Sequence, residues 1–151
     1  MPTKVAMHSA YHRSVVLGLC AAIACASASC GRRPPEIPAD AAIGASVALP
    51  TPRVEPNQAA PAILKMHFSS LDVRRGQRWT GEFVTGTSVA SVEVRTNLFS
   101  IDVPRAGSGR FGFALNVLDA PPIFIRAYRL RVIARNSGGR EYEQDLPFEL
   151  R

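Results

Sequence analysis

Few residues in this chain could carry catalytic chemistry. Past residue 30 the sequence has one histidine, His67, and no cysteine. A nucleophile such as serine needs a neighbouring base, most often histidine. His67 alternates with Leu64, Met66 and Phe68, and residues at odd spacing on a strand point to opposite faces. We therefore expect His67 on the solvent side or at an edge of a strand, and not in a catalytic site.

One acidic cluster has the spacing of metal ligands. Glu141, Glu143 and Asp145 share one face of a strand near the C-terminus, and carboxylate oxygens are ligands that Ca²⁺ prefers. Arginines alternate along the preceding segment, which predicts that these carboxylates form ion pairs instead. The turn at Gly107-Ser108-Gly109 joins two strands and precedes no helix, so it is not a phosphate-binding loop. We expect no catalytic residue, no metal and no cofactor.

The arginines and carboxylates belong to a predicted hairpin that turns at Ser-Gly-Gly. Matching inward residues with inward residues across the hairpin leaves two registers. One pairs Arg131 with Glu143, and the other pairs Arg131 with Asp145 and Arg135 with Glu141. Both need a turn with an odd number of residues, in which a glycine takes positive φ. The basic row is therefore predicted to be largely neutralised.

Short alternating segments recur every ten or so residues from residue 62 onwards, separated by Gly, Pro, Asn, Asp and Ser. Seven strands are predicted, at 63–69, 78–85, 89–96, 98–103, 110–118, 126–135 and 140–150. Turns are expected at 72–77 and 105–109, and no segment has a helical period. This pattern favours an all-β, seven-stranded antiparallel sandwich of two sheets, with a closed small barrel as the alternative.

The alternation also predicts which side chains face the core. On the first strand these are Leu64, Met66 and Phe68, and on the second Trp79 and Phe83. On the third strand we expect Ala90, Val92 and Val94 inward, with Glu93 and Arg95 outward.

Residues 1–30 have the three parts of a secretory signal: basic residues, an apolar run from Val15 to Ala26, and small residues after it. Ser27-Ala28-Ser29-Cys30-Gly31 resembles a bacterial lipobox, which implies that Cys30 is lipidated and becomes the mature N-terminus. Cys25 is a second candidate, and Ala26-Ser27-Ala28 would also suit ordinary signal peptidase. We expect a secreted or lipid-anchored protein of a bacterial cell envelope.

The next segment, residues 31–61, holds seven of the twelve prolines and no aromatic residue. It predicts an extended, disordered linker between the signal and a domain over 62–151.

The domain resembles immunoglobulin-like and fibronectin type III-like domains of bacterial secreted and surface proteins. The pattern Tyr128-x-Leu-x-Val-x-Ala134-x-Asn136-x-x-Gly139 looks like their F strand and the turn after it. Trp79 is similar to their core tryptophan. The resemblance implies that Tyr128 packs between the sheets at a tyrosine corner. It implies a fold and no function.

The net charge is +6, and the predicted domain carries thirteen basic and nine acidic residues. This slightly favours anionic envelope polymers or lipid headgroups as partners. Lysine occurs only at positions 4 and 65, which argues against a nucleic-acid binder.

Two surfaces could contact a partner. One is the apolar loop with Ile123 and Phe124, and the other is the basic turn with Arg74, Arg75 and Arg78. We expect a non-catalytic interaction module that binds a protein or envelope polysaccharide. The alternative is an accessory substrate-binding domain in envelope polymer metabolism, and a small secreted hydrolase is a weaker one.

Overall fold

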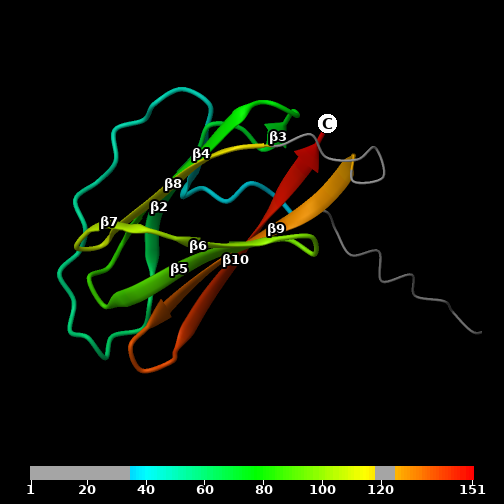
Figure 1. Ribbon diagram of the computed structural model, residues 1–151. Helices are drawn as coiled ribbons and strands as arrows, with labels where there is room; N and C mark the ends of the chain where they lie inside the picture. Colours follow the sequence, from blue (N-terminus) through cyan, green and yellow to red (C-terminus); the bar gives the residue numbers. More distant parts are fainter. Residues whose placement is uncertain (1–34, 118–124) are drawn as a thin grey trace, which may run out of the picture. The chain divides into compact units, whose positions relative to one another are not determined.

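The computed structural model describes residues 35–117 and 125–151, which form ten strands and no helix (Figure 1). The predicted signal with Cys25 and Cys30 lies outside the described residues, and so do Ile123 and Phe124. Within the two described ranges, no helical segment has the length and apolarity needed to cross a membrane.

The strands form two sheets of five. The first sheet has the order β1-β2-β4-β8-β7, with bounds β1 Ala41–Ile43, β2 Ile63–Phe68, β4 Arg78–Thr85, β8 Arg110–Asn116 and β7 Arg105–Gly107. The second has the order β3-β10-β9-β5-β6, with bounds β3 Asp72–Val73, β10 Glu141–Leu150, β9 Arg126–Asn136, β5 Val89–Arg95 and β6 Ser100–Val103. The fold is all-β, and its two sheets are compatible with a β-sandwich.

The long strands lie where the sequence pattern predicts them, but the sheets are mixed and not purely antiparallel. Three short strands were not expected: β1 comes from the predicted linker, and β3 and β7 come from predicted turns. β1 runs parallel to β2, and β3 runs parallel to β10. Parallel pairing needs a long connection between the strands. The nineteen residues between β1 and β2, and the much longer path from β3 to β10, provide it.

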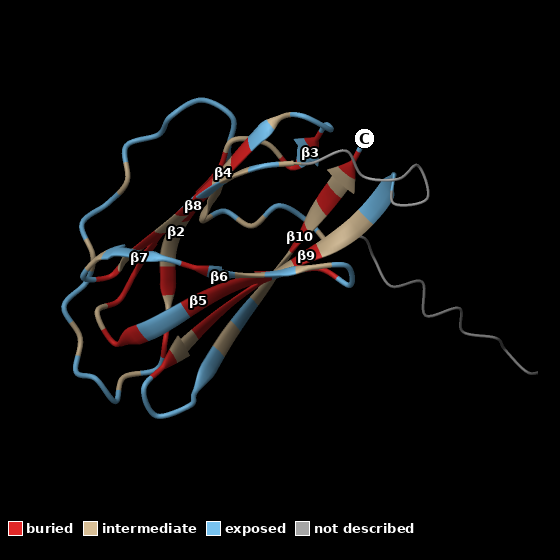
Figure 2. Cartoon of the chain, in the orientation of Figure 1, coloured by how far each residue is buried: buried red, intermediate tan, exposed pale blue. Residues whose placement is uncertain are grey.

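The core lies between the sheets and is centred on Trp79, which is fully buried. The tryptophan ring contacts Phe68 and Phe113 from its own sheet and Phe148 from the other. Its indole N–H donates to the carbonyl of Ser70 at 2.9 Å, so its polar atom is satisfied. Figure 2 shows buried residues along strands of both sheets and exposed residues in the β9–β10 turn.

Gly81 of β4 allows this ring packing. A Cβ atom at position 81 would overlap the ring of Phe113, which lies on the adjacent strand β8. A larger residue here would therefore force the ring of Phe113 or the strand to shift.

Two bulges change which side chains face inward. The register of β2 against β4 shifts between Ile63 and Lys65, so Ile63 is buried and Leu64 is only half-buried. The register of β5 against β9 shifts after Val89, so Val89 is buried and Ala90 is exposed. The predicted inward positions of Leu64 and Ala90 are therefore wrong, because a bulge inserts a residue that breaks strict alternation.

The described part of the predicted linker, residues 35–61, is ordered against the sheets, which corrects the expectation of a disordered segment. The N–H of Met66 donates to the carbonyl of Asp40, and the N–H of Gly44 donates to the carbonyl of Phe68, both at 2.9 Å. These bonds flank β1 and fix it to β2. The side chain of Ala41 packs against the core.

A second set of contacts holds the rest of this segment. The hydroxyl of Ser88 donates to the Glu55 carboxylate at 2.9 Å, and the Glu55 N–H donates to the Thr87 hydroxyl at 2.8 Å. The side-chain amide of the buried Asn136 donates to the carbonyl of Ala59 at 2.9 Å. Backbone and polar contacts thus hold a segment whose large apolar side chains, such as Ile37 and Val54, are mostly exposed.

Candidate functional site

His67 contacts two backbone carbonyl oxygens and a carboxylate. It is 7% exposed, and its Nε2 lies 3.2 Å from the carbonyl oxygen of Gly44 and 3.0 Å from that of Ala45. Its Nδ1 lies 3.6 Å from the Glu82 carboxylate. The expectation of a solvent-side histidine is wrong because the segment after β1 covers this face of β2. The contacts of His67 with Gly44 and Ala45 fix the segment after β1 on β2.

The β9–β10 hairpin adopts one of the two predicted registers. Glu141 pairs with Arg135 and Asp145 pairs with Arg131. Both pairs form ion pairs, at 2.6 Å and 2.9 Å, which confirms the predicted neutralisation. Gly139 has a φ of 78°, as the odd-numbered turn requires.

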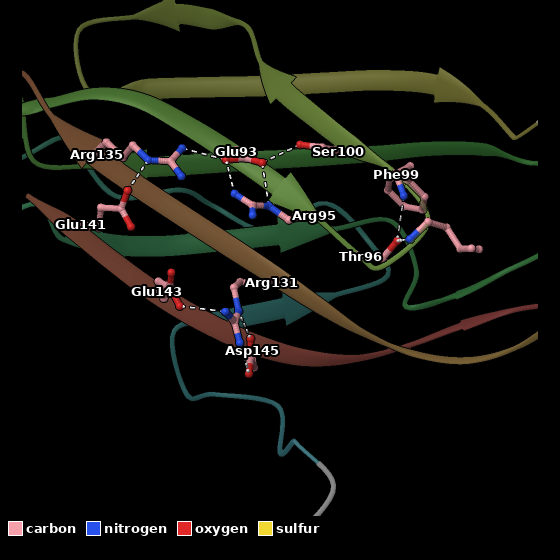
Figure 3. A network of polar contacts seen from close by, with 11 residues as sticks. Glu93, Arg95, Thr96, Phe99, Ser100, Arg131, Arg135, Glu141, Glu143 and Asp145 are labelled. Carbon is pink, nitrogen blue, oxygen red and sulfur yellow. Dashed lines mark hydrogen bonds and ion pairs between the residues drawn. The ribbon is translucent and has the colours of Figure 1, made fainter. Parts of the chain in front are cut away.

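A charge network centred on Glu93 covers the outer face of β5, β9 and β6 (Figure 3). The Glu93 carboxylate accepts hydrogen bonds from Nε and Nη2 of Arg95 at 2.8 and 3.0 Å. It also accepts from Ser100 at 2.6 Å and from Arg135 at 2.7 Å, and Arg135 in turn reaches Glu141. We call these five residues the Glu93 network.

The network stabilises the ionised form of Glu93. The hydrogen bonds from Arg95 are the largest cause, and together with those from Ser100 and Arg135 they outweigh partial burial and lower the pKa of Glu93 to about 2. Glu93 is only 8% exposed, so a buried carboxylate is held charged by surrounding donors. The sequence predicted Glu93 as an outward residue but not that it would be buried at the centre of a network.

A second feature lies on the same face, beside the first part of β9. A hollow of about 700 Å³ is lined by four arginines, an aromatic ring and small or polar residues: Pro35, Arg95, Thr96, Asn97, Arg126, Ala127, Tyr128, Arg129 and Arg131. None of these described lining residues is acidic. We call this feature the arginine hollow.

Unequal strand lengths create the hollow. β5 ends at Arg95, opposite Arg131, whereas β9 begins at Arg126. After β5 the chain turns towards β6, with the Thr96 N–H donating to the carbonyl of Phe99 at 2.8 Å. β5 therefore does not extend along the first part of β9, and space is left between the turn and that strand.

Carboxylates behind the lining hold several of its guanidinium groups in place. Arg131 donates to Asp145 through Nε and also pairs with Glu143 at 3.1 Å, and Arg129 pairs with the same Asp145 at 3.0 Å. Burial raises the pKa of Asp145, but Arg131 and Arg129 outweigh it and hold that pKa below its usual value. Arginines held in this way lose little entropy when they bind a ligand.

Arg126 differs from the other three arginines. Its guanidinium lies over the ring of Tyr128, with Cζ 5.2 Å from the ring centroid, and no ion pair joins it to a described residue. Arg95 and Arg131 lie directly opposite each other across β5 and β9, and each guanidinium is paired with a carboxylate, Glu93 or Asp145. The hollow can therefore bind an anionic group, and guanidinium groups suit phosphate and carboxylate.

The predicted contact residues lie elsewhere. Arg74, Arg75 and Arg78 are exposed around the turn between β3 and β4, and none lines the arginine hollow. Tyr128 packs against Phe148 and the core, and its ring also lines the hollow. Within the described ranges, no group of His, Cys, Asp or Glu has the arrangement of a metal site.

The arginine hollow does not follow from the sequence pattern because it depends on where β5 ends relative to β9. The difference in length between the segments predicted as strands at 89–96 and 126–135 is the sequence feature that could have indicated it. No known protein family model matches the chain, and no curated protein shows significant similarity to it.

Proposed function

We propose that this chain is a non-catalytic binding module of a bacterial cell envelope, with an immunoglobulin-like or fibronectin type III-like sandwich. It is lipid-anchored at Cys30 or secreted, and it binds anionic groups in the arginine hollow. The observation that carries the proposal is a hollow lined by four arginines, three of them held by carboxylates behind the lining and one, Arg126, with no ion pair to a described carboxylate. Acidic proteins, acidic polysaccharides and phospholipids all present carboxylate or phosphate groups.

The geometry favours binding over catalysis. The hollow holds donors and a fixed positive charge, and arginine remains protonated at any physiological pH, so none of its four cations can act as a general base. Histidine is a side chain that can act as a general base, but His67 is held by the carbonyls of Gly44 and Ala45.

Arg126 and Arg140 provide a matched test of binding. Both are exposed, and they lie at the start of β9 and in the turn at its other end. With polygalacturonate as the probe, Arg126→Gln should weaken binding about five-fold, since one exposed charge contact contributes about 1 kcal/mol. Arg140→Gln should leave binding unchanged. Equal affinity of all three proteins, or equal binding of neutral dextran, would refute the proposed site.

The anchor is tested separately. Metabolic labelling with a radioactive fatty acid should mark the wild-type chain and leave a Cys30→Ala variant unmarked. An unlabelled wild-type chain would remove lipidation from the proposal and leave secretion.

A further inference from the structure

We infer that the arginine hollow docks on the phosphate groups of anionic phospholipids, in the membrane that carries the Cys30 anchor. This inference rests on the proposed function and names the ligand of the same site. Three features support it: the arginines of the lining, two exposed aliphatic residues next in sequence to lining residues, and the length of chain between the hollow and Cys30.

The first feature is the charge of the lining. Phosphate oxygens accept the paired N–H donors of a guanidinium group, and arginine is the side chain best suited to this geometry. Arg126 and Arg129 are three residues apart on β9, and Arg131 is two further on. Arg129 and Arg131 lie on one face of the strand and Arg126 on the other, so guanidinium groups from both faces of β9 line the same hollow.

The second feature is apolar. Leu98 and Ile125 are each 39% exposed and belong to the six exposed large hydrophobic residues of the described chain. Leu98 follows Asn97, and Ile125 precedes Arg126, so each is next in sequence to a residue that lines the hollow. Aliphatic side chains beside cations are typical of surfaces that lie in the membrane interface. A polysaccharide has no apolar phase to receive them.

The third feature is the length of the tether. Pro35 lines the hollow, and Cys30 is five residues before it in the sequence. Five residues reach at most about 18 Å, so a lipidated Cys30 would keep the hollow close to the headgroups. The same five-residue stretch contains Arg32 and Arg33. Such a short tether makes docking effectively intramolecular, which favours even weak headgroup contacts.

The absence of cysteine beyond residue 30 makes a site-specific test possible. The lipidated, processed chain would have no free thiol, so Asn97→Cys and Ser137→Cys would each place one dye on an exposed position. Position 97 lines the hollow, and position 137 lies in the β9–β10 turn at the other end of β9. Each labelled protein is reconstituted in phosphatidylcholine vesicles with a lipid-borne quencher, with and without phosphatidylglycerol.

We expect phosphatidylglycerol to increase quenching of the dye at 97 and to leave the dye at 137 unchanged. Adding Arg126→Gln should lower the ratio of docked to undocked protein about five-fold, because one basic residue near an anionic surface contributes about 1 kcal/mol. Adding Arg140→Gln should not change this ratio of docked to undocked protein. Equal quenching at 97 in the two vesicle types would overturn the inference.

Two soluble probes separate this inference from the proposed function. Polygalacturonate and polyglutamate are added to the dye-labelled protein in neutral detergent micelles. The dye at 97 could respond to either polymer and not to phosphatidylglycerol. The hollow would then bind a polysaccharide or an acidic protein, and headgroup docking alone would be overturned. No response to any of the three would overturn both.

Discussion

The Glu93 network and the arginine hollow use the same strands and the same residue type with different results. At Arg135 the arginine lies between two carboxylates, Glu93 and Glu141, and its charge is balanced. At Arg126, nine residues earlier on β9, no described carboxylate forms an ion pair, and the guanidinium lies over an aromatic ring. An arginine row therefore has no single role. Its role at each position depends on what the neighbouring strand places opposite it.

The largest effect should come from breaking the Glu93 network. Glu93→Gln removes the charge that Arg95 and Arg135 share and leaves both hydrogen bonded to a neutral amide at best. Because the remaining arginines are partly exposed, the loss of the charge-assisted hydrogen bonds should cost about 2 kcal/mol, and urea unfolding measures it. Arg126→Gln is the contrast, and its change in stability should be below about 0.5 kcal/mol. If the two variants are equally stable, the network and the hollow do not differ in the way described.

Acid should reduce the contribution of the Glu93 network to folding stability over a defined pH range. The pKa of Glu93 is about 2 in the folded protein and 4.5 in the unfolded chain, so the folded state binds fewer protons between these values. Its contribution to stability is complete above pH 4.5 and falls as the pH approaches 2, by up to about 3 kcal/mol. Urea unfolding at decreasing pH measures this loss.

Glu93→Gln provides the control for the acid series. The variant should lose less stability than the wild type over the same pH range. The same slope in both proteins would assign the acid sensitivity to other carboxylates, such as Asp145.

The smallest effect should come from the hairpin pair at the edge of the network. The side chains of Arg135 and Glu141 are 30% and 44% exposed, so solvent screens their attraction. Glu141→Gln should cost no more than about 0.5 kcal/mol. A double-mutant cycle with Arg135→Gln isolates the pair, and a coupling above about 1 kcal/mol would show that Glu141 belongs to the network energetically as closely as Glu93 does.

The contrast between network and hollow also shows what sequence patterns can predict. Alternation and the matching of inward faces narrowed the hairpin to two registers, because a hairpin register is a local property, and the structure adopts the one with the Arg135–Glu141 and Arg131–Asp145 pairs. The inward position of Trp79 followed in the same way. The positions of the seven long strands also followed from the alternation of apolar and polar residues.

Other features could not be predicted because they depend on segments distant in the sequence. The burial of His67 requires that residues 44–45 lie over β2, and the order in residues 35–61 comes from backbone hydrogen bonds, which have no side-chain signature. The bulges at 63–65 and 89–91 break the alternation on which the inward positions were based. The hollow requires the relative ends of β5 and β9.

The pairing of β1 with β2 has a mechanical consequence. β1 is the first described strand of the chain, so tension applied from the N-terminal side loads its hydrogen bonds to β2 before it reaches the core. Peeling this segment away would release the 27 residues from 35 to 61, which extend to about 90 Å at 3.4 Å per residue. The segment is therefore the first part of the described chain that such a pull would extend.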